Sequence, residues 1–368
     1  MENNMDISNL SVGTIVETLT EMYVKAIRNR FSFRRLRTVF LWGPPGVGKS
    51  DGVRQIAEKV EKETGKRVVV TEANLILFSP VDLMGLPVAD KEHELTVWLR
   101  PSIFKMDPSE EVVNILFMDE LSAVTPEVQK AAYQIALERK VGEHHFPENC
   151  IVIAAGNRKT DNGMVYRMLH PLANRMMHFN VRPDFAGWKK WATDAGIHPY
   201  VIGYLSGNIG KLSKENLDAD RVAFPTPRSW TFVSDLLHLY GSESPDKLFH
   251  QISGCIGAGT ALEFVSWCKN HMQLPDTEEI FRGVAKTYPK TPDALYALVL
   301  SMTAYVKEQK EYLTNDRLEN GCKYVSRFPA DYATMFYKEI LKIDGMRIRL
   351  SKVSSFKAWM KKTEGAYV

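Results

Sequence analysis

Short apolar runs alternate with amphipathic stretches along the first half of the chain. Five runs have the length and composition of buried strands in a parallel sheet, and they are Val39–Trp42, Val68–Val70, Ile115–Met118, Ile151–Ala154 and Met176–Val181. Helical patterns lie between most of them, notably Asp51–Glu63 and Pro126–Glu138. The second helix is expected to begin with Thr125 as its cap. This alternation predicts an α/β fold.

A further helix is predicted before the first strand. Apolar residues recur at helical spacing from Ile15 to Ile27, and Thr14 and Glu17 have the spacing of a capping box. The basic stretch RNRFSFRRLR, Arg28–Arg37, follows. Arginine mixed with phenylalanine could contact nucleic acid, but such a run is more often a solvated helix end, and we favour that interpretation.

The pattern changes after Arg182-Pro183, where helical periodicities separated by Gly and Pro replace the strand-like runs. The longest apolar run, Ala294–Val306, contains polar residues and is too short to cross a bilayer, so we expect a buried helix. The last amphipathic piece, SFKAWMKKTE, is expected to pack on its own domain. The predicted domains are an α/β core with the N-terminal helix (1–182), a helical lid (183–265) and a C-terminal helical extension (266–368).

Composition and charge indicate a globular chain and give little information about its partner. With 368 residues, 45% apolar and 25% charged, the chain has room for two or three domains. A formal charge of +3 gives no strong argument for a polyanionic partner. The four cysteines form no C-x-x-C pair, which favours a reducing compartment over a zinc ribbon or a disulfide framework. The polar N-terminal segment lacks the apolar core of a secretory signal, so we expect a cytoplasmic protein without membrane association.

The segment GPPGVGKS, Gly43–Ser50, follows the first predicted strand and precedes a helix. In that context the pattern G-x-x-x-x-G-K-[ST] predicts a phosphate-binding loop, in which backbone N–H groups and the helix dipole hold the β-phosphate. Lys49 is expected to contact the β- and γ-phosphates and Ser50 to bind magnesium. The residues expected to contact the nucleotide are Gly43, Pro44, Pro45, Gly46, Val47, Gly48, Lys49, Ser50, Asp51 and Arg228.

Two adjacent carboxylates follow the third predicted strand. Asp119 is expected to hold magnesium through water, and Glu120 to polarise the attacking water as a general base. Adjacent carboxylates at a strand end are unfavourable without a cation. The next strand leads to Asn157, whose amide is expected to hold that water in line, although an asparagine in this position alone is usually a turn residue.

Arg175 stands directly before the fifth strand, and no residue near it in sequence can pair with it. A surface salt bridge is the simplest interpretation of this arginine.

Arg228 falls near the start of another predicted helix, with Thr226 as cap and Pro227 in the first turn. The helix dipole disfavours a cation there, and a contact with a nucleotide phosphate would relieve the conflict.

In this order the motifs resemble those of the AAA+ ATPases. The segments VDLMGLP, LERKVGEHHFPENCIVIAAGN, HPLANRMMHF and TPRSW resemble the MoxR branch, which is related to the dynein-type AAA domain, and the resemblance spans Arg37–Tyr240. The MoxR pattern often has Ile-Asn-Arg after the paired acids, whereas this chain has Leu121-Ser122-Ala123. The resemblance implies a P-loop core with a parallel five-stranded sheet flanked by helices, followed by a helical lid and a C-terminal helical region.

For function, the resemblance implies ATP hydrolysis with Mg²⁺ in a homo-oligomeric, hexameric ring. Arg175 matches the arginine that enters the site of the neighbouring subunit, where such a residue is worth about 10³ to 10⁵ in rate. It is therefore expected to have no partner in its own chain, and Arg158 and Arg167 are weaker candidates for the same role. The lid would sense the nucleotide, and hydrolysis would remodel a client, often alongside a von Willebrand A domain protein. A nucleic-acid motor or loader of the same fold and a nucleotide-gated scaffold with negligible turnover remain alternatives.

Two insertions and one glycine motif complete the predictions. Leu86–Val88 and Leu95–Trp98 flank a charged turn and predict a hairpin that could project toward a pore. The segment Arg139–Pro147 predicts a second hairpin. We expect His144 and His145 to be exposed residues of its turn and favour this over a role as metal ligands. No strand leads into Gly254-x-x-Gly257-x-Gly259, which favours close helix packing over a dinucleotide site.

Overall fold

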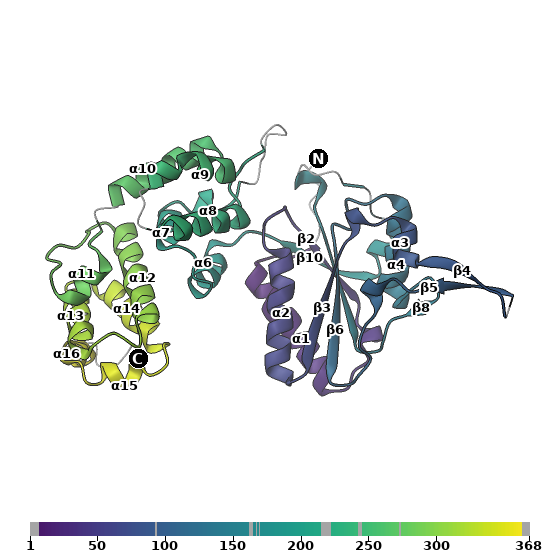
Figure 1. Cartoon of the computed structure of the whole chain (residues 1–368), viewed down its shortest axis with the longest axis horizontal. Helices are drawn as coiled ribbons and strands as arrows, with labels where there is room; N and C mark the ends of the chain where they lie inside the picture. Colours follow the sequence, from purple (N-terminus) through teal and green to yellow (C-terminus); the bar gives the residue numbers. More distant parts are fainter. Residues whose placement is uncertain are drawn as a thin grey trace. The chain divides into compact units, whose positions relative to one another are not determined.

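The computed structural model describes residues 7–92, 94–161, 165–166, 168, 170–214, 222–241, 245–271 and 274–362 (Figure 1). They divide into two compact units. The first contains the described residues of Met1–Trp188, Ser213–Arg221 and Thr226–Arg228, and the second those of Lys189–Leu212, Val222–Pro225 and Ser229–Val368. The predicted division between a lid at 183–265 and an extension at 266–368 stays a prediction.

A parallel sheet of six strands forms the centre of the first unit. Its order is β1 (Asn9–Leu10), β10 (Met176–Val181), β2 (Thr38–Trp42), β9 (Cys150–Gly156), β6 (Val112–Asp119) and β3 (Arg67–Asn74). All five predicted strands are present, but the prediction of five strands in total is wrong. The additional strand, β1, pairs in parallel with β10, with Asn9 opposite Asn180. Two residues are too few to give an apolar pattern in the sequence.

Both faces of the sheet are covered by helices. Helices α1 (Val12–Arg28) and α2 (Lys49–Thr64) lie on one face, and α3 (Pro80–Met84) and α4 (Pro126–Glu138) lie on the other (Figure 1). Alternate residues of one strand enter different cores, because successive side chains of a strand point to opposite faces. In β2, Val39 and Leu41 belong to the core under α1 and α2, and Phe40 belongs to the core under α4. This double burial explains the continuous apolar runs.

The start of α1 differs from the prediction. Ser11 is the N-cap, and its Oγ accepts a hydrogen bond from the N–H of Thr14 at 3.1 Å. The capping box predicted at Thr14 is therefore wrong, because the helix begins earlier at Val12 and Thr14 lies in its first turn. Thr125 occupies the N-cap of α4 as expected, but its side chain makes no cap hydrogen bond.

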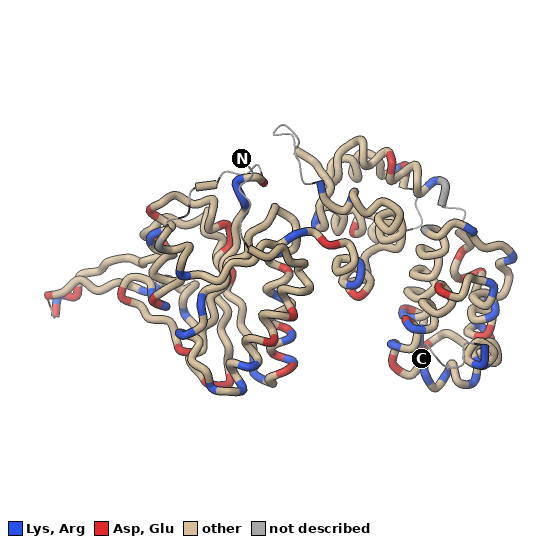
Figure 2. Tube along the Cα trace, turned by 180° about the vertical axis from the view of Figure 1, so that it is seen from behind, with Lys and Arg blue, Asp and Glu red and all other residues tan. Residues whose placement is uncertain are grey.

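Both predicted hairpins are present. Strands β4 (Leu86–Asp90) and β5 (Leu95–Leu99) pair antiparallel and extend away from the sheet (Figure 1), and Figure 2 shows charges of both signs at the tip. In the second hairpin β7 (Lys140–Val141) pairs with β8 (His144–His145). The two histidines thus lie in a strand, not in a turn. Across the described residues, no group of three acidic, histidine or cysteine side chains could hold a metal ion.

The basic segment after α1 folds back onto its own unit. Phe33 is buried in a short 3-10 helix, Phe33–Arg35. Arg34 forms an ion pair with Glu148 at 2.7 Å, and the guanidinium of Arg35 lies over the ring of Phe31. All five arginines of the segment are nevertheless exposed, as expected for a solvated helix end.

The second unit is helical, and no strand follows Val181 in the part of the chain that the structure describes. The helices after β10 are α6 (Phe185–Asp194), α7 (Pro199–Gly207), α8 (Pro227–Tyr240), α9 (Phe249–Ile256), α10 (Ala258–His271), α11 (Thr277–Arg282), α12 (Pro292–Glu308), α13 (Asn315–Val325), α14 (Ala330–Leu341), α15 (Met346–Leu350) and α16 (Ser354–Lys362). The apolar run Ala294–Val306 lies in α12 and contributes to the core. Phe356 and Trp359 of α16 pack on Tyr337, as predicted for this amphipathic piece. Of the helices described, none is long and apolar enough to span a membrane.

The glycine motif near α9 forms a turn between helices. Gly257 ends α9 with a φ of 81°, and a Cβ there would lie 2.9 Å from the carbonyl oxygen of Ala223. A Cβ on Gly254 or Gly259 would meet nothing within 4 Å. The prediction that these glycines allow close helix packing is therefore wrong for Gly254 and Gly259.

Candidate functional site

The loop between β2 and α2 has a conformation that depends on its glycines. Gly46 and Gly48 have φ angles of 74° and 102°, in the left-handed region that favours glycine. A Cβ on Gly43 would lie 2.9 Å from the carbonyl oxygen of Val181, and one on Gly46 would lie 2.9 Å from Oγ1 of Thr226. The motif alone indicated that these glycines bend the loop, but it carried no sign that Val181 and Thr226 pack against them.

Lys49 is the first residue of α2, and its side chain is folded back under the loop. Its Nζ donates to the carbonyl oxygens of Gly43 at 2.7 Å and Pro44 at 3.1 Å, and to Oδ1 of Asn157 at 3.1 Å. These three acceptors match the three donors of an ammonium group. Burial lowers the pKa of Lys49 to about 8, and the negative charge of Asp119 opposes this shift. The cation is thus held at the loop, where a phosphate could replace the carbonyl acceptors.

Ser50 and Asp119 bring two oxygen ligands together. Asp119 ends β6, and its Oδ2 accepts a hydrogen bond from Oγ of Ser50 at 3.2 Å. A hydroxyl and a carboxylate are hard oxygen donors of the kind that Mg²⁺ prefers. Magnesium is usually bound by one or two carboxylates together with waters and substrate phosphates, so this small set fits the ion.

Glu120 and Asn157 are in direct contact. Oε2 of Glu120 accepts a hydrogen bond from Nδ2 of Asn157 at 3.0 Å, and the oxygen of the same amide accepts from Lys49. Glu120 has a φ of 58°, which is uncommon for a residue with a side chain and is frequent at functional sites. Burial, and then the charge of Asp119, raise the pKa of the Glu120 carboxyl. A carboxylate with a raised pKa beside an amide could act as a base towards water.

Arg228 lies beside this group within the first unit. Its N–H donates to the carbonyl oxygen of Gly46 at 3.3 Å. Burial is the main cause of the lowered pKa of Lys49 and the raised pKa of Glu120, and the positive charge of Arg228 adds to the first shift and opposes the second. Pro227 is the first residue of α8, as predicted, and Thr226 is buried directly before it. The arginine is therefore close to the position of a bound phosphate, and its contact with nucleotide stays a prediction.

Arg175 is the one proposed catalytic residue that does not lie near Lys49, Glu120 and Asn157. It precedes β10 at the amino edge of the parallel sheet, because Met176 pairs with Thr38 at the start of β2. The phosphate loop and Asp119 lie at the opposite, carboxyl edge. Its exposed side chain donates to the hydroxyl of Tyr133 and lies over that ring. The expectation that Arg175 has no partner in its own chain is wrong, since this neutral phenol contacts it.

Arg158 and Arg167 are the weaker candidates for the arginine that acts in a neighbouring subunit. Arg158 forms an ion pair with Asp161 at 2.9 Å, with both side chains largely buried, and also donates to Asn180. Arg167 lies outside the described residues.

Sequence reasoning missed one residue of the site, Ser122. Its Oγ accepts a hydrogen bond from the N–H of Asn157 at 2.8 Å. The only signal for it was a polar residue two positions after Glu120.

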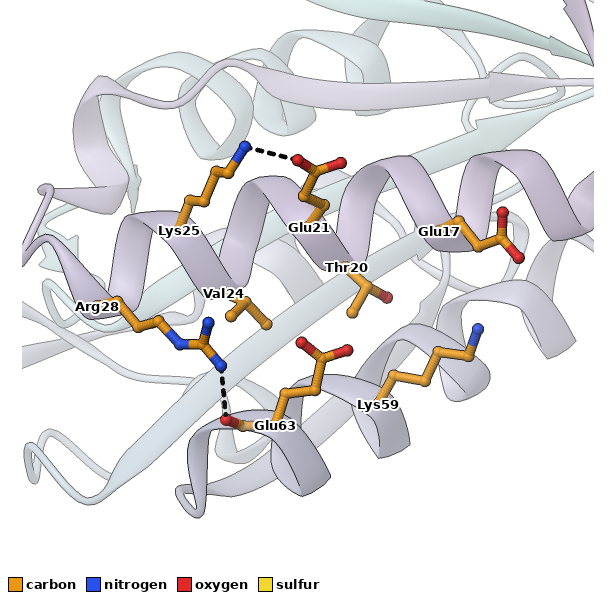
Figure 3. Close-up of a pocket in the computed structure, with 8 residues that line it drawn as sticks. All are labelled: Glu17, Thr20, Glu21, Val24, Lys25, Arg28, Lys59 and Glu63. Carbon is orange, nitrogen blue, oxygen red and sulfur yellow. Dashed lines mark hydrogen bonds and ion pairs between the residues drawn. The ribbon is translucent and has the colours of Figure 1, made fainter.

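A separate pocket of about 270 Å³ opens between α1 and α2 (Figure 3). It is lined by Glu17, Thr20, Glu21, Val24, Lys25, Arg28, Lys59 and Glu63. Two of its cations are already engaged, since Lys25 pairs with Glu21 and Arg28 donates to the carbonyl oxygen of Glu63. None of the lining residues belongs to the phosphate loop or to the strand ends, so we do not assign a ligand to this pocket.

Residues 39–180 match the family model described as ATPase family associated with various cellular activities (AAA). The match runs from β2 to β10 and includes the phosphate loop, Asp119, Glu120 and Asn157. The first unit thus has the expected AAA+ α/β core with a parallel sheet between helices, and helices follow it. No curated protein matches the sequence.

Several solved structures resemble the chain at low identity. A mutant of RuvB from Thermotoga maritima is 16% identical, covering 80% of this chain and 86% of that one with a TM-score of 0.38. PCH-2 of C. elegans is 14% identical, covering 71% and 69% with a TM-score of 0.37. NtrX of Brucella abortus is 14% identical, covering 86% and 67% with a TM-score of 0.35.

Proposed function

We propose that the chain binds ATP with Mg²⁺ at the loop between β2 and α2 and hydrolyses its terminal phosphoanhydride bond. One observation carries this proposal. The amide of Asn157 joins Lys49 to Glu120, with 3.1 Å and 3.0 Å contacts, at the carboxyl edge of the sheet. A cation for phosphate oxygens and a carboxylate for water are thus fixed on one neutral side chain.

Each residue has a defined part in this reaction. The backbone N–H groups of the loop and the start of α2 bind the phosphates, and Lys49 moves from its carbonyl acceptors to the β- and γ-phosphate oxygens. Bound magnesium, held by Ser50 and Asp119, would neutralise developing negative charge on the phosphate oxygens. Glu120 accepts a proton from the attacking water, and Asn157 holds that water in line.

A ring of identical subunits would complete the site. Arg175 lies at the amino edge of its own sheet and cannot serve its own phosphate loop, which supports a role in the site of a neighbouring subunit. We propose a hexameric ring in which Arg228 senses the nucleotide. The motif resemblance to the MoxR branch supports remodelling of a client protein, with a von Willebrand A domain protein as a candidate partner.

The substitution Glu120→Gln tests the proposed chemistry. The amide keeps the size of the side chain but removes its basicity, so ATP binding should persist while phosphate release falls by at least about 10²-fold. Glu58→Gln is the matched control, because Glu58 is exposed on α2. Equal turnover by the wild type and Glu120→Gln would remove Glu120 from the role of base.

A further inference from the structure

Ser122 lies directly behind the pair formed by Glu120 and Asn157. Its side chain is 0% exposed, and its Oγ accepts a hydrogen bond from the N–H of Asn157 at 2.8 Å. Gly156 makes this approach possible, because a Cβ built there would lie 2.5 Å from Oγ of Ser122. The serine hydroxyl therefore fills the space that a side chain at residue 156 would need.

The turn that carries Ser122 is fixed by backbone hydrogen bonds. The N–H of Leu121 donates to the carbonyl oxygen of Ala155 at 2.9 Å, and the N–H of Tyr166 donates to the carbonyl oxygen of Ser122 at 2.8 Å. Glu120, with its left-handed backbone, begins the same turn. The hydroxyl of Ser122 thus joins the end of β6, which carries the carboxylates, to the end of β9, which carries the amide.

We propose that Ser122 is a positioning residue for ATP hydrolysis, acting through Asn157; this inference rests on the proposed function. The side chain of Asn157 contacts both Glu120 and Lys49, so its backbone position decides whether both contacts form. Without the hydroxyl, the N–H of Asn157 is buried without an acceptor, and residue 157 must move to find one. A displacement of about 1 Å in a positioning group can lower a rate by about 10²-fold.

The substitution Ser122→Ala tests this role by separating turnover from binding. We expect kcat to fall by about 10- to 100-fold, because Asn157 no longer holds Glu120 and the water in line. KM for ATP and the affinity for a fluorescent ADP analogue should change by less than about twofold, since the loop binds the phosphates. An unchanged kcat in an active protein, or a loss that appears in nucleotide affinity instead, would overturn the proposal.

A double-mutant cycle with Asn157→Ala identifies the residue through which Ser122 acts. If Ser122 works by positioning the amide, Ser122→Ala should lower kcat by less than about twofold once that amide is absent. The same loss in both backgrounds would show that the hydroxyl acts independently of Asn157, and the proposal would be wrong.

Ser234→Ala is the matched control for the loss of a buried hydroxyl. Ser234 is 1% exposed, and its Oγ accepts from the N–H of His198 at 2.8 Å, so the chemical change is the same in the second unit. It should lower the melting temperature similarly and leave kcat unchanged. Equal losses of kcat in both variants would overturn a specific role for Ser122.

Two further comparisons keep the outcome clear. If Ser122→Ala does not fold, Ser122→Cys, of similar size but with a weaker acceptor, enters the same cycle. A wild type that turns over no faster than Glu120→Gln would defeat the proposed function and this inference together. An active wild type with an equally active Ser122→Ala would defeat the inference alone.

Discussion

Nζ of Lys49 lies 3.1 Å from Oδ1 of Asn157, so the lysine at the start of α2 is joined to the residue that follows β9. The same asparagine donates to Glu120 at 3.0 Å through its amide nitrogen. Lys49 and Glu120 therefore contact different atoms of one amide. Nucleotide binding would draw Lys49 from the carbonyl oxygens of Gly43 and Pro44 to a phosphate, and its contact with Asn157 would keep the amide in place.

Asn157→Ala should therefore impair turnover more than binding. We expect kcat to fall by about 10²- to 10³-fold, because removing one hydrogen-bond donor aimed at the reacting groups has an effect of this size. The affinity for an ADP analogue should stay within about threefold, because the loop glycines and Lys49 remain. Steady-state phosphate release and fluorescence titration measure the two quantities. A loss of binding as large as the loss of kcat would contradict this role.

The sequence identified the parts of the site but not all of their contacts. Strands buried on both faces leave continuous apolar runs, and the motifs at their ends placed Lys49, Asp119, Glu120 and Asn157 correctly as neighbours at one edge. The position of Ser122 depends on how the end of β6 meets the end of β9, and no local pattern records that register. Tertiary contacts rather than local signals decided these details.

The short elements were harder to predict than the long ones. Strand β1 exists because Asn9 and Leu10 pair with β10, and a dipeptide carries no strand signal of its own. The helices of the second unit followed from periodicity, but their packing did not. The core around Tyr337, for example, joins α14 to α16 through aromatic contacts between residues far apart in sequence.

Glu319→Gln should weaken the attachment of α16. The carboxylate of Glu319 accepts hydrogen bonds from the N–H groups of Ser354 and Ser355, at 2.7 Å and 3.3 Å, at the start of that helix. A negative charge at a helix N-terminus is favourable, and loss of such a cap lowers the free energy of unfolding by about 0.5–2 kcal/mol. Urea unfolding followed by tryptophan fluorescence measures the change. Glu311→Gln, at an exposed glutamate, is the control and should change little.

The stability of the second unit should fall in mild acid because of His198. The ring caps α7, where Nδ1 accepts from the N–H of Tyr200 at 3.2 Å, and burial, followed by the charge of His238, lowers the pKa of His198 to about 3. The unfolded chain, with the ordinary pKa of 6.5, therefore binds more protons than the folded chain between these values. The stabilising contribution is complete above about pH 6.5 and is lost as the pH falls towards 3, by up to about 1.4 kcal/mol per pH unit.

His198→Asn isolates that titration, because asparagine is also a good N-cap but does not ionise in this range. The free energy of unfolding in urea should fall less steeply between pH 6.5 and about pH 5 in the variant than in the wild type. His250→Asn, at an exposed histidine, should keep the wild-type slope. Parallel slopes for wild type and His198→Asn would show that His198 does not titrate differently on unfolding.

Arg175→Ala should abolish most turnover without preventing nucleotide binding, because its guanidinium lies at the edge of the sheet opposite its own phosphate loop. If a neighbouring subunit uses it, kcat should fall by about 10³-fold or more. Mixing Arg175→Ala with Glu120→Gln subunits should then restore part of the activity, since some interfaces pair an intact Glu120 with an intact Arg175. Tyr133→Phe is the control for the contact within the chain, because it removes only the hydroxyl that Arg175 contacts. Tyr133→Phe should retain turnover. If the mixture of Arg175→Ala and Glu120→Gln subunits is no more active than the two variants measured separately, each subunit works alone and Arg175 does not act in a neighbouring site.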